Sequence, residues 1–196
     1  MEKTAGGAKL NVEVKKLTPE LVESFLHFFD HVAFQDNEKW ASCYCHFYRR
    51  EWADGEWGER GAEENREAAV QWIKANGLNG YLAFADGEPV GWCHANDAGN
   101  VVKGNHIERE PDAKTGVFAC FIVAPDHRGK GIATQLLHAA CEGFKEDGYA
   151  YVEGYPAKQG ETVQHHYHGP LAMYEENGFA LVTDYDDDNV VMRKAL

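Results

Sequence analysis

The segment Val117–Val123 reads VFACFIV and is apolar at every position. A strand that is apolar on both faces is typical of the interior of a sheet that is covered on both sides. A glycine-containing turn follows, then a helical pattern from about Ile132 to Asp147 that ends at Gly148, then a second apolar run over 149–155. Strand, helix and strand in this order predict a right-handed parallel crossover. This unit places the chain in the α/β class, with a mixed sheet.

The remaining pattern predicts helices and antiparallel strands around this unit. Thr18 offers a capping hydroxyl and Pro19 suits the first helical position, so we expect a helix from here to about His31. A second helix is expected over 62–76, with Gly77 as its C-cap. Further strands are expected at 10–14, 81–85 and 90–93 and around Leu181 and Val191, with a hairpin turn at 86–89 and a short helix at 170–177.

Composition and charge exclude several classes of protein. The chain has 196 residues, which suits one domain spanning residues 1–196. Its 19 basic and 32 acidic side chains give a formal net charge of −13, which argues against binding a phosphate backbone. No segment approaches the ~18 uninterrupted apolar residues of a membrane span, and the N-terminus lacks the apolar core of a signal peptide. Five cysteines without a regular spacing suggest a reducing compartment, so we expect a cytoplasmic protein that binds neither nucleic acid nor membrane.

The turn between the central strand and its helix combines glycines with cations. Two glycines let the backbone approach a ligand closely, and the following helix directs free N–H groups and its positive dipole end toward that place. Arg128 and Lys130 add charge that suits a pyrophosphate. On these residues alone, a tight turn with two solvated cations accounts for the pattern equally well. The turn reads Arg128-Gly129-Lys130-Gly131-Ile132-Ala133.

The wider context resembles a known family. The pattern Arg-x-x-Gly-x-Ala at 128–133, after a strand that ends in Val123-Ala124-Pro125, resembles the coenzyme A-binding motif of the GNAT N-acetyltransferase superfamily. Residues 80–92 are similar to the second and third strands of that fold, and 173–179 match its C-terminal Tyr-Glu-x-x-Gly-Phe signature. The resemblance therefore covers most of the chain. The segments 42–45 and 152–156 further resemble a poorly characterised bacterial subgroup.

This resemblance implies a fold and a co-substrate. The fold is a mixed central sheet of about seven strands, flanked by about four helices. Two parallel strands, here around 117–123 and 149–155, would splay apart in a V where the thioester of acetyl-CoA enters. The sequence departs from the family at Ala133, where glycine is common, and both residues are small. The implied cofactor-binding residues are Phe121, Ile122 and Val123 on the strand, Arg128, Gly129, Lys130, Gly131, Ile132 and Ala133 in the turn, and Tyr174.

Acetyl transfer to an amine needs a neutral nucleophile, an oxyanion stabiliser and a proton for the departing thiolate. The resemblance assigns the proton to Tyr174, and the alternative is a tyrosine that only packs its ring. We favour Glu153 as the base because it lies on the strand that lines the split, although a carboxylate that only binds substrate fits equally well. The backbone N–H of Val123 is the natural oxyanion donor.

The resemblance implies direct attack by a primary amine within a ternary complex, and we expect the amine to belong to a small cationic molecule. The irregular aromatic stretch 34–60 is the first candidate for the acceptor pocket. Open alternatives are a protein lysine or N-terminus as acceptor, and a CoA-binding sensor without turnover; a homodimer is expected by analogy. The substrate-binding residues that we assign are Trp40, Tyr44, Trp92, Tyr155, His166 and His168, of which either histidine could replace Glu153 as the base.

Two short clusters raise the question of a metal. The cysteines of Cys43-x-Cys45-His46 are closer in sequence than the usual two-residue separation of a zinc knuckle, and the sequence has no second cysteine pair to complete such a site. Adjacent histidines, as in 165–168, point in different directions in most local conformations. We therefore expect no metal site, with buried thiols that pack as small hydrophobic groups. The acidic run 184–188 predicts a solvated turn between the last two strands.

Overall fold

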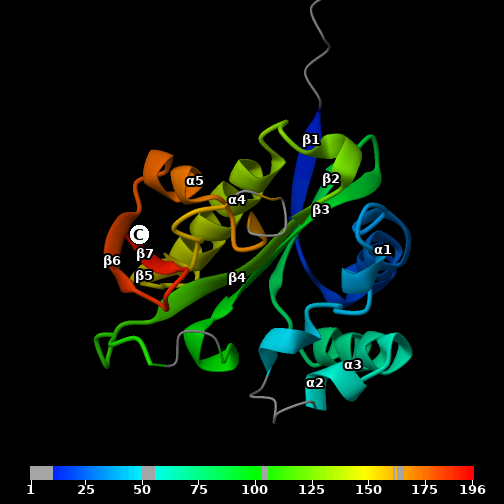
Figure 1. Ribbon diagram of the computed structural model, residues 1–196, viewed down its shortest axis with the longest axis horizontal. Coiled ribbons are helices and arrows are strands. Elements are labelled where there is room, and N and C mark those ends of the chain that lie inside the picture. Colours follow the sequence, from blue (N-terminus) through cyan, green and yellow to red (C-terminus); the bar gives the residue numbers. More distant parts are fainter. Residues whose placement is uncertain (1–10, 50–55, 103–105, 161, 163–165) are drawn as a thin grey trace, which may run out of the picture.

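A seven-stranded mixed sheet forms the centre of the molecule (Figure 1). The computed structural model describes residues 11–49, 56–102, 106–160, 162 and 166–196. The strand order is β1-β2-β3-β4-β5-β7-β6, and β4 and β5 form the parallel pair. The α/β class and the mixed sheet of about seven strands are confirmed. The strands are β1 (Val12–Lys16), β2 (Gly80–Ala85), β3 (Glu88–Asp97), β4 (Thr115–Val123), β5 (Tyr151–Gly154), β6 (Ala180–Asp184) and β7 (Val190–Ala195).

Helices cover both faces of this sheet. Figure 1 shows α1 and α3 on one side and α4 and α5 on the other. No helix in the described ranges is both long and apolar enough to cross a bilayer. The helices are α1 (Val22–His27), α2 (Glu56–Glu59), α3 (Ala62–Lys74), α4 (Ile132–Glu146) and α5 (Leu171–Glu176).

The ends of the first helices differ in detail from the expectation. Thr18 makes no side-chain cap to the backbone, and its hydroxyl instead bonds the Glu20 carboxylate. After α3, Asn76 takes the left-handed conformation (φ 54°), so the end of the helix does not need Gly77 for a positive φ. Gly77 is needed for space, because a Cβ there would lie 1.9 Å from the Trp72 indole nitrogen. The hairpin between β2 and β3 is confirmed, with positive φ at Asp86 and Gly87.

Two apolar clusters lie on the two faces of the sheet, and β4 contributes to both. Val117 and Ala119 belong to the cluster with α1 and α3, whereas Phe118 and Phe121 belong to the one with α4. The pairing of β3 with β4 is interrupted by a β-bulge between His94/Cys120 and Ala95/Phe118, which leaves Ala119 as the extra residue. Because of this bulge, Cys120 lies on the same face as Ala119 instead of the opposite one.

Candidate active site

The sheet opens beside the bulge. β4 and β5 pair from Thr115/Tyr151 to Phe118/Gly154, and β4 then continues without β5 as far as Val123. A segment before α5 takes the place of the missing strand. The N–H of Phe121 donates to the Tyr167 carbonyl at 2.6 Å, and His168 Nδ1 donates to the Ala119 carbonyl at 2.7 Å. The predicted V-shaped split is therefore present.

The loop at the start of α4 has the backbone that its glycines require. Gly129 and Gly131 adopt φ of 72° and 76°, a region that other residues rarely enter. A Cβ at either position would meet nothing within 4 Å, so the glycines serve backbone conformation and not packing. α4 begins at Ile132 and is 15 residues long. The first N–H groups of a helix have no intrahelical acceptor, so this loop and α4 together can hold an anion.

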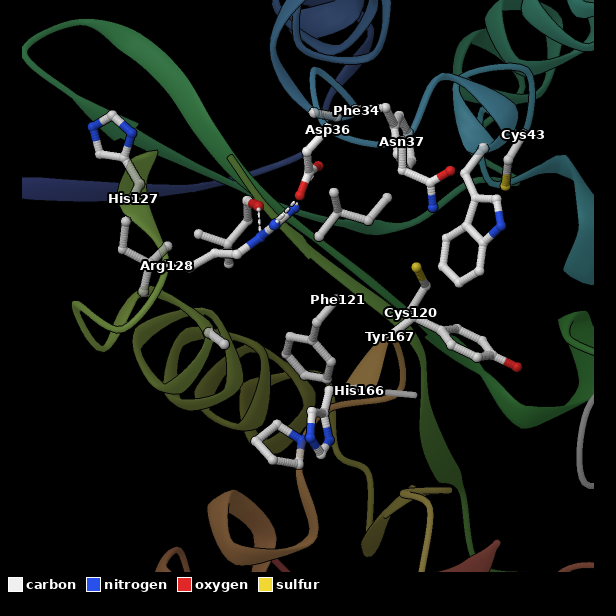
Figure 2. A pocket seen from close by; sticks show the side chains of 18 of the residues that line it. Phe34, Asp36, Asn37, Cys43, Cys120, Phe121, His127, Arg128, His166 and Tyr167 are labelled. Carbon is white, nitrogen blue, oxygen red and sulfur yellow. Dashed lines mark hydrogen bonds and ion pairs between the residues drawn. The ribbon is translucent and has the colours of Figure 1, made fainter. Parts of the chain in front are cut away.

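Arg128 is already bound by the protein in this structure. Its Nη2 donates to Asp36 Oδ1 at 3.1 Å, Nη1 bonds the other oxygen of the same carboxylate, and Nε donates to the Val123 carbonyl at 3.1 Å (Figure 2). The hydrogen bond from Arg128 holds the pKa of Asp36 below its usual value. The segment that contains Asp36 is thereby fastened to the glycine loop, 92 residues away in the sequence.

A pocket of about 650 Å³ connects the glycine loop with the aromatic stretch. We call its two parts the loop end, at Val123, 128–129 and 131–134, and the aromatic end. Figure 2 shows Cys120 from β4 and Cys43 from the loop after α1 pointing into the same cavity. The aromatic end consists of Trp40, Phe47, Tyr48, Trp57 and Tyr167.

Most of the residues predicted to bind the cofactor line this pocket, and most of those predicted to bind the acceptor do not. Lys130 is exposed and lies outside the lining. Of the acceptor residues, Trp40 and His166 line the pocket. The cofactor residues that line it are Phe121, Ile122, Val123, Arg128, Gly129, Gly131, Ile132 and Ala133.

Four predicted acceptor residues have other partners. Trp92 is fully buried in the core, and its Nε1–H donates to Cys45 Sγ at 3.0 Å. The hydroxyl of Tyr44 donates to Asp30 at 2.7 Å, and neither residue is part of the pocket lining. Tyr155 and His168 are also fully buried and stand outside the lining. Sequence reasoning placed them in the pocket because their segments border it, but their side chains face the core.

Tyr174 is fully buried beside the split. Its hydroxyl donates to the His168 carbonyl at 2.6 Å, and burial raises its pKa well above the usual value. Two glycines make room for the ring, since a Cβ at Gly154 would lie 2.3 Å from its carbons and one at Gly169 would lie 3.0 Å away. The phenol is therefore held protonated, as an acid must be, but it stands outside the pocket lining. Its catalytic and cofactor-binding roles stay predictions.

Glu153 lies in a buried ion-pair cluster. Arg109 donates to Oε2 at 2.8 Å and Arg193 Nε donates to Oε1 at 2.8 Å, while the Tyr155 hydroxyl donates to Oε2 at 3.1 Å. The carboxylate is fully buried and does not line the pocket. Its role as the base stays a prediction, and the geometry favours a structural role that joins β5 and β7 to the segment before β4.

Three thiols lie together at the aromatic end. Cys43 and Cys45 share a hydrogen bond, and Cys45 shares another with Cys120. The hydrogen bond with Cys45 and burial raise the pKa of Cys43 well above its usual value, and burial and the hydrogen bond with Cys120 do the same for Cys45. Within the described ranges no group of three or more His, Cys, Asp or Glu is arranged to hold a metal ion, and His165 lies outside those ranges.

Sequence reasoning missed several residues of the pocket. Tyr48 falls in the aromatic stretch already singled out, so a signal for it existed. Asp36 falls in the same stretch and Tyr167 lies between two of the singled-out histidines, but the roles of both depend on contacts with Arg128 and Phe121 far along the chain. Cys120 is a possible nucleophile on the predicted central strand, but the face on which it lies depends on the bulge, which no alternation of polar and apolar residues reveals.

Comparison with known proteins agrees with this geometry. The family model described as "Acetyltransferase (GNAT) family" matches residues 44–179. A search of curated proteins found no match. Solved structures of similar fold include a PaiA N-acetyltransferase from Thermoplasma acidophilum in complex with coenzyme A, which is 20% identical. The match covers 95% of this chain and 100% of that one, with a TM-score of 0.56.

Two other solved structures have a similar fold. The GNAT domain of S. lividans PAT is 16% identical over 94% of this chain and 90% of that one, with a TM-score of 0.58. A chain of the NatC complex, bound to Gag peptide and CoA, is 14% identical over 95% of this chain and 99% of that one, with a TM-score of 0.54. At these identities the likeness shows the fold alone. The family match covers more than half of the chain, and the protein belongs to the GNAT acetyltransferase family.

Proposed function

We propose that this protein is an N-acetyltransferase that moves the acetyl group of acetyl-CoA to a primary amine of a small molecule. The observation that carries the proposal is the single pocket that is lined by the glycine loop, by the end of β4 at 120–123 and by the aromatic end. A two-substrate transfer needs a site of this shape, because the donor and the acceptor must meet. We expect direct attack of the amine while both substrates are bound.

The loop end fits the pyrophosphate of coenzyme A. Gly129, Gly131 and the start of α4 present backbone N–H groups, and Arg128 can exchange Asp36 for a phosphate oxygen. The pantetheine arm would lie along the end of β4 at Ile122 and Val123, beyond the segment that contains Tyr167. The N–H of Phe121 is already bonded to the Tyr167 carbonyl, so the N–H of Val123 is the donor that we propose on that edge of the strand.

Acetyl-CoA, when bound, supplies an activated acetyl group. In the overall transfer the thioester C–S bond breaks, an amide C–N bond forms and the amine proton ends on the CoA thiol. The residues proposed around this step are the Val123 N–H, which would stabilise the carbonyl oxygen, and Tyr174, which would supply the proton. His166 lines the pocket and is therefore better placed than Glu153 to accept a proton from the amine.

The five free cysteines support a reducing compartment, and we propose a cytoplasmic location. A homodimer remains an expectation by analogy that light scattering of the purified chain would test.

The experiment that tests the function is turnover of acetyl-CoA with a panel of amines, with the acetylated product identified by mass spectrometry. Tyr174→Phe should lower kcat by about 10²–10⁴-fold while acetyl-CoA still binds. Unchanged turnover would remove Tyr174 from the chemistry. Binding of acetyl-CoA without turnover on any amine or peptide would favour a silent CoA-binding module, and turnover only on peptides would favour a protein acetyltransferase.

A further inference from the structure

The aromatic end of the pocket is a set of rings that hold one another in place. Trp40 contacts Tyr167 edge-to-face with ring centroids 5.6 Å apart, and Phe47 contacts Trp57 in the same way at 5.1 Å. Tyr48 shares a side-chain hydrogen bond with Tyr167. Rings that brace one another in this way form a wall before any ligand binds, which lowers the ordering cost of binding.

This wall is open to solvent at two places. Trp40 is 38% exposed and Phe47 is 42% exposed, whereas most large apolar side chains of the described chain are buried. Both residues line the pocket, so an apolar ligand would cover surface that water now covers. Edge-to-face contacts of this kind favour an aromatic ring as the group that completes the wall.

The charges around the pocket argue against a polycation. Asp36 is the one carboxylate among the described lining residues, and it lies beside Arg128 at the loop end, away from the aromatic end. Lys39, also in the lining, would repel an ammonium group. The attraction of ring faces for an ammonium offsets only part of the cost of removing it from water.

We infer that the acceptor is a small aromatic monoamine, whose ring packs against Trp40 and Phe47 while its single primary amine points toward the loop end. This inference rests on the proposed function and narrows it. A molecule with several amines would place its other ammonium groups in the aromatic end, which has no carboxylate among its described lining residues. An aromatic monoamine carries one ammonium, which must lose its proton before attack in any case.

The test compares 2-phenylethylamine with ethylamine and putrescine, with the full chain and saturating acetyl-CoA. We expect kcat/KM for 2-phenylethylamine to exceed the other two by at least about tenfold, since only its ring gains apolar contacts. Trp40→Ala should remove most of this advantage through KM, and Trp40→Phe should retain it. Leu181→Ala is the matched control, because Leu181 is an exposed apolar residue (64%) on β6, away from the pocket.

A second variant gives a readout that a merely structural role would not move. Ser42 lines the pocket, so Ser42→Asp adds the carboxylate that the aromatic end lacks. The ratio of putrescine to 2-phenylethylamine turnover should rise about fivefold or more in this variant.

Calorimetry separates the two ways of failing. If acetyl-CoA does not bind, the proposed function itself fails. If acetyl-CoA binds, two results would overturn the inference. One is that putrescine or a lysine peptide is a better acceptor than 2-phenylethylamine, and the other is that 2-phenylethylamine does not bind to the CoA-loaded protein. The inference is supported if 2-phenylethylamine binds to the CoA-loaded protein, if Trp40→Ala weakens this binding and if Leu181→Ala leaves it unchanged.

Discussion

Replacing Glu153 by glutamine tests whether this carboxylate serves the fold or the chemistry. Its side chain has no exposed surface, and it receives guanidinium donors from Arg109 and Arg193. Glutamine has the same shape and keeps one carbonyl oxygen, but it removes the negative charge and turns an amide N–H₂ toward a guanidinium. The variant therefore leaves two partly buried cations without their counter-ion.

The magnitude follows from the burial of the three groups. Removing one partner of a buried ion pair costs about 3–5 kcal/mol of stability. The two arginine side chains keep 17% and 22% of their surface exposed, so water recovers part of that loss. We expect the free energy of unfolding to fall by roughly 2–4 kcal/mol. For a chain of this size that lowers Tm by about 4–16 °C.

Denaturant unfolding followed by tryptophan fluorescence measures this effect, and acetyl-transfer rates are taken on the same samples below the midpoint. Glu110→Gln is the matched control, since Glu110 is an exposed carboxylate that bonds only at the surface with Tyr151. It should change the free energy of unfolding by less than about 0.5 kcal/mol. An unfolding free energy equal to that of the wild type for Glu153→Gln, together with a loss of turnover of 100-fold or more, would refute the structural role and restore Glu153 as the base.

Two further predictions concern the packing and the pH dependence of the fold. Gly154→Ala would place a Cβ 2.3 Å from the Tyr174 ring, so it should lower the free energy of unfolding by about 1–3 kcal/mol. Gly58→Ala is the control, because a Cβ there meets nothing within 4 Å and should leave the free energy of unfolding unchanged. Equal stability of the two variants would mean that the ring is not held against β5. Burial lowers the pKa of His94 to about 3, so between pH 6.5 and 3 the unfolded chain binds a proton that the folded chain does not, and stability falls as the pH drops through this window. From pH 7 to pH 5 His94 should account for a loss of about 2 kcal/mol, which His94→Phe should abolish; the same loss in both proteins would show that His94 is not buried in its neutral form.

The fold could be predicted from the sequence because its signals are local. The apolar run of β4, the glycine at 148 and the turn at 86–87 act within a few residues, and the structure has each element where they indicate. The glycine loop was also readable, since Gly129 and Gly131 both need positive φ.

The acceptor side of the site could not be predicted in the same way. The β-bulge at Ala119 moves Cys120 to the face of Ala119, and a residue-by-residue alternation places it on the other face. Trp92 and Tyr155 lie in segments that border the site, yet each points into the core, where Cys45 and Glu153 provide their hydrogen bonds. These contacts join segments far apart in the chain, so only the folded structure shows them.

The most direct test of the account is calorimetric titration of the purified protein with acetyl-CoA. We expect one saturable site in the wild type, and no measurable binding in an Arg128→Glu, Lys130→Glu double variant, which reverses both charges of the glycine loop without placing a side chain at positive φ. A Lys15→Glu, Lys74→Glu double variant carries the same change of net charge on exposed residues outside the pocket lining and should bind like the wild type. Absence of binding in the wild type, or equal binding in the loop variant, would contradict the claim that the loop before α4 holds coenzyme A.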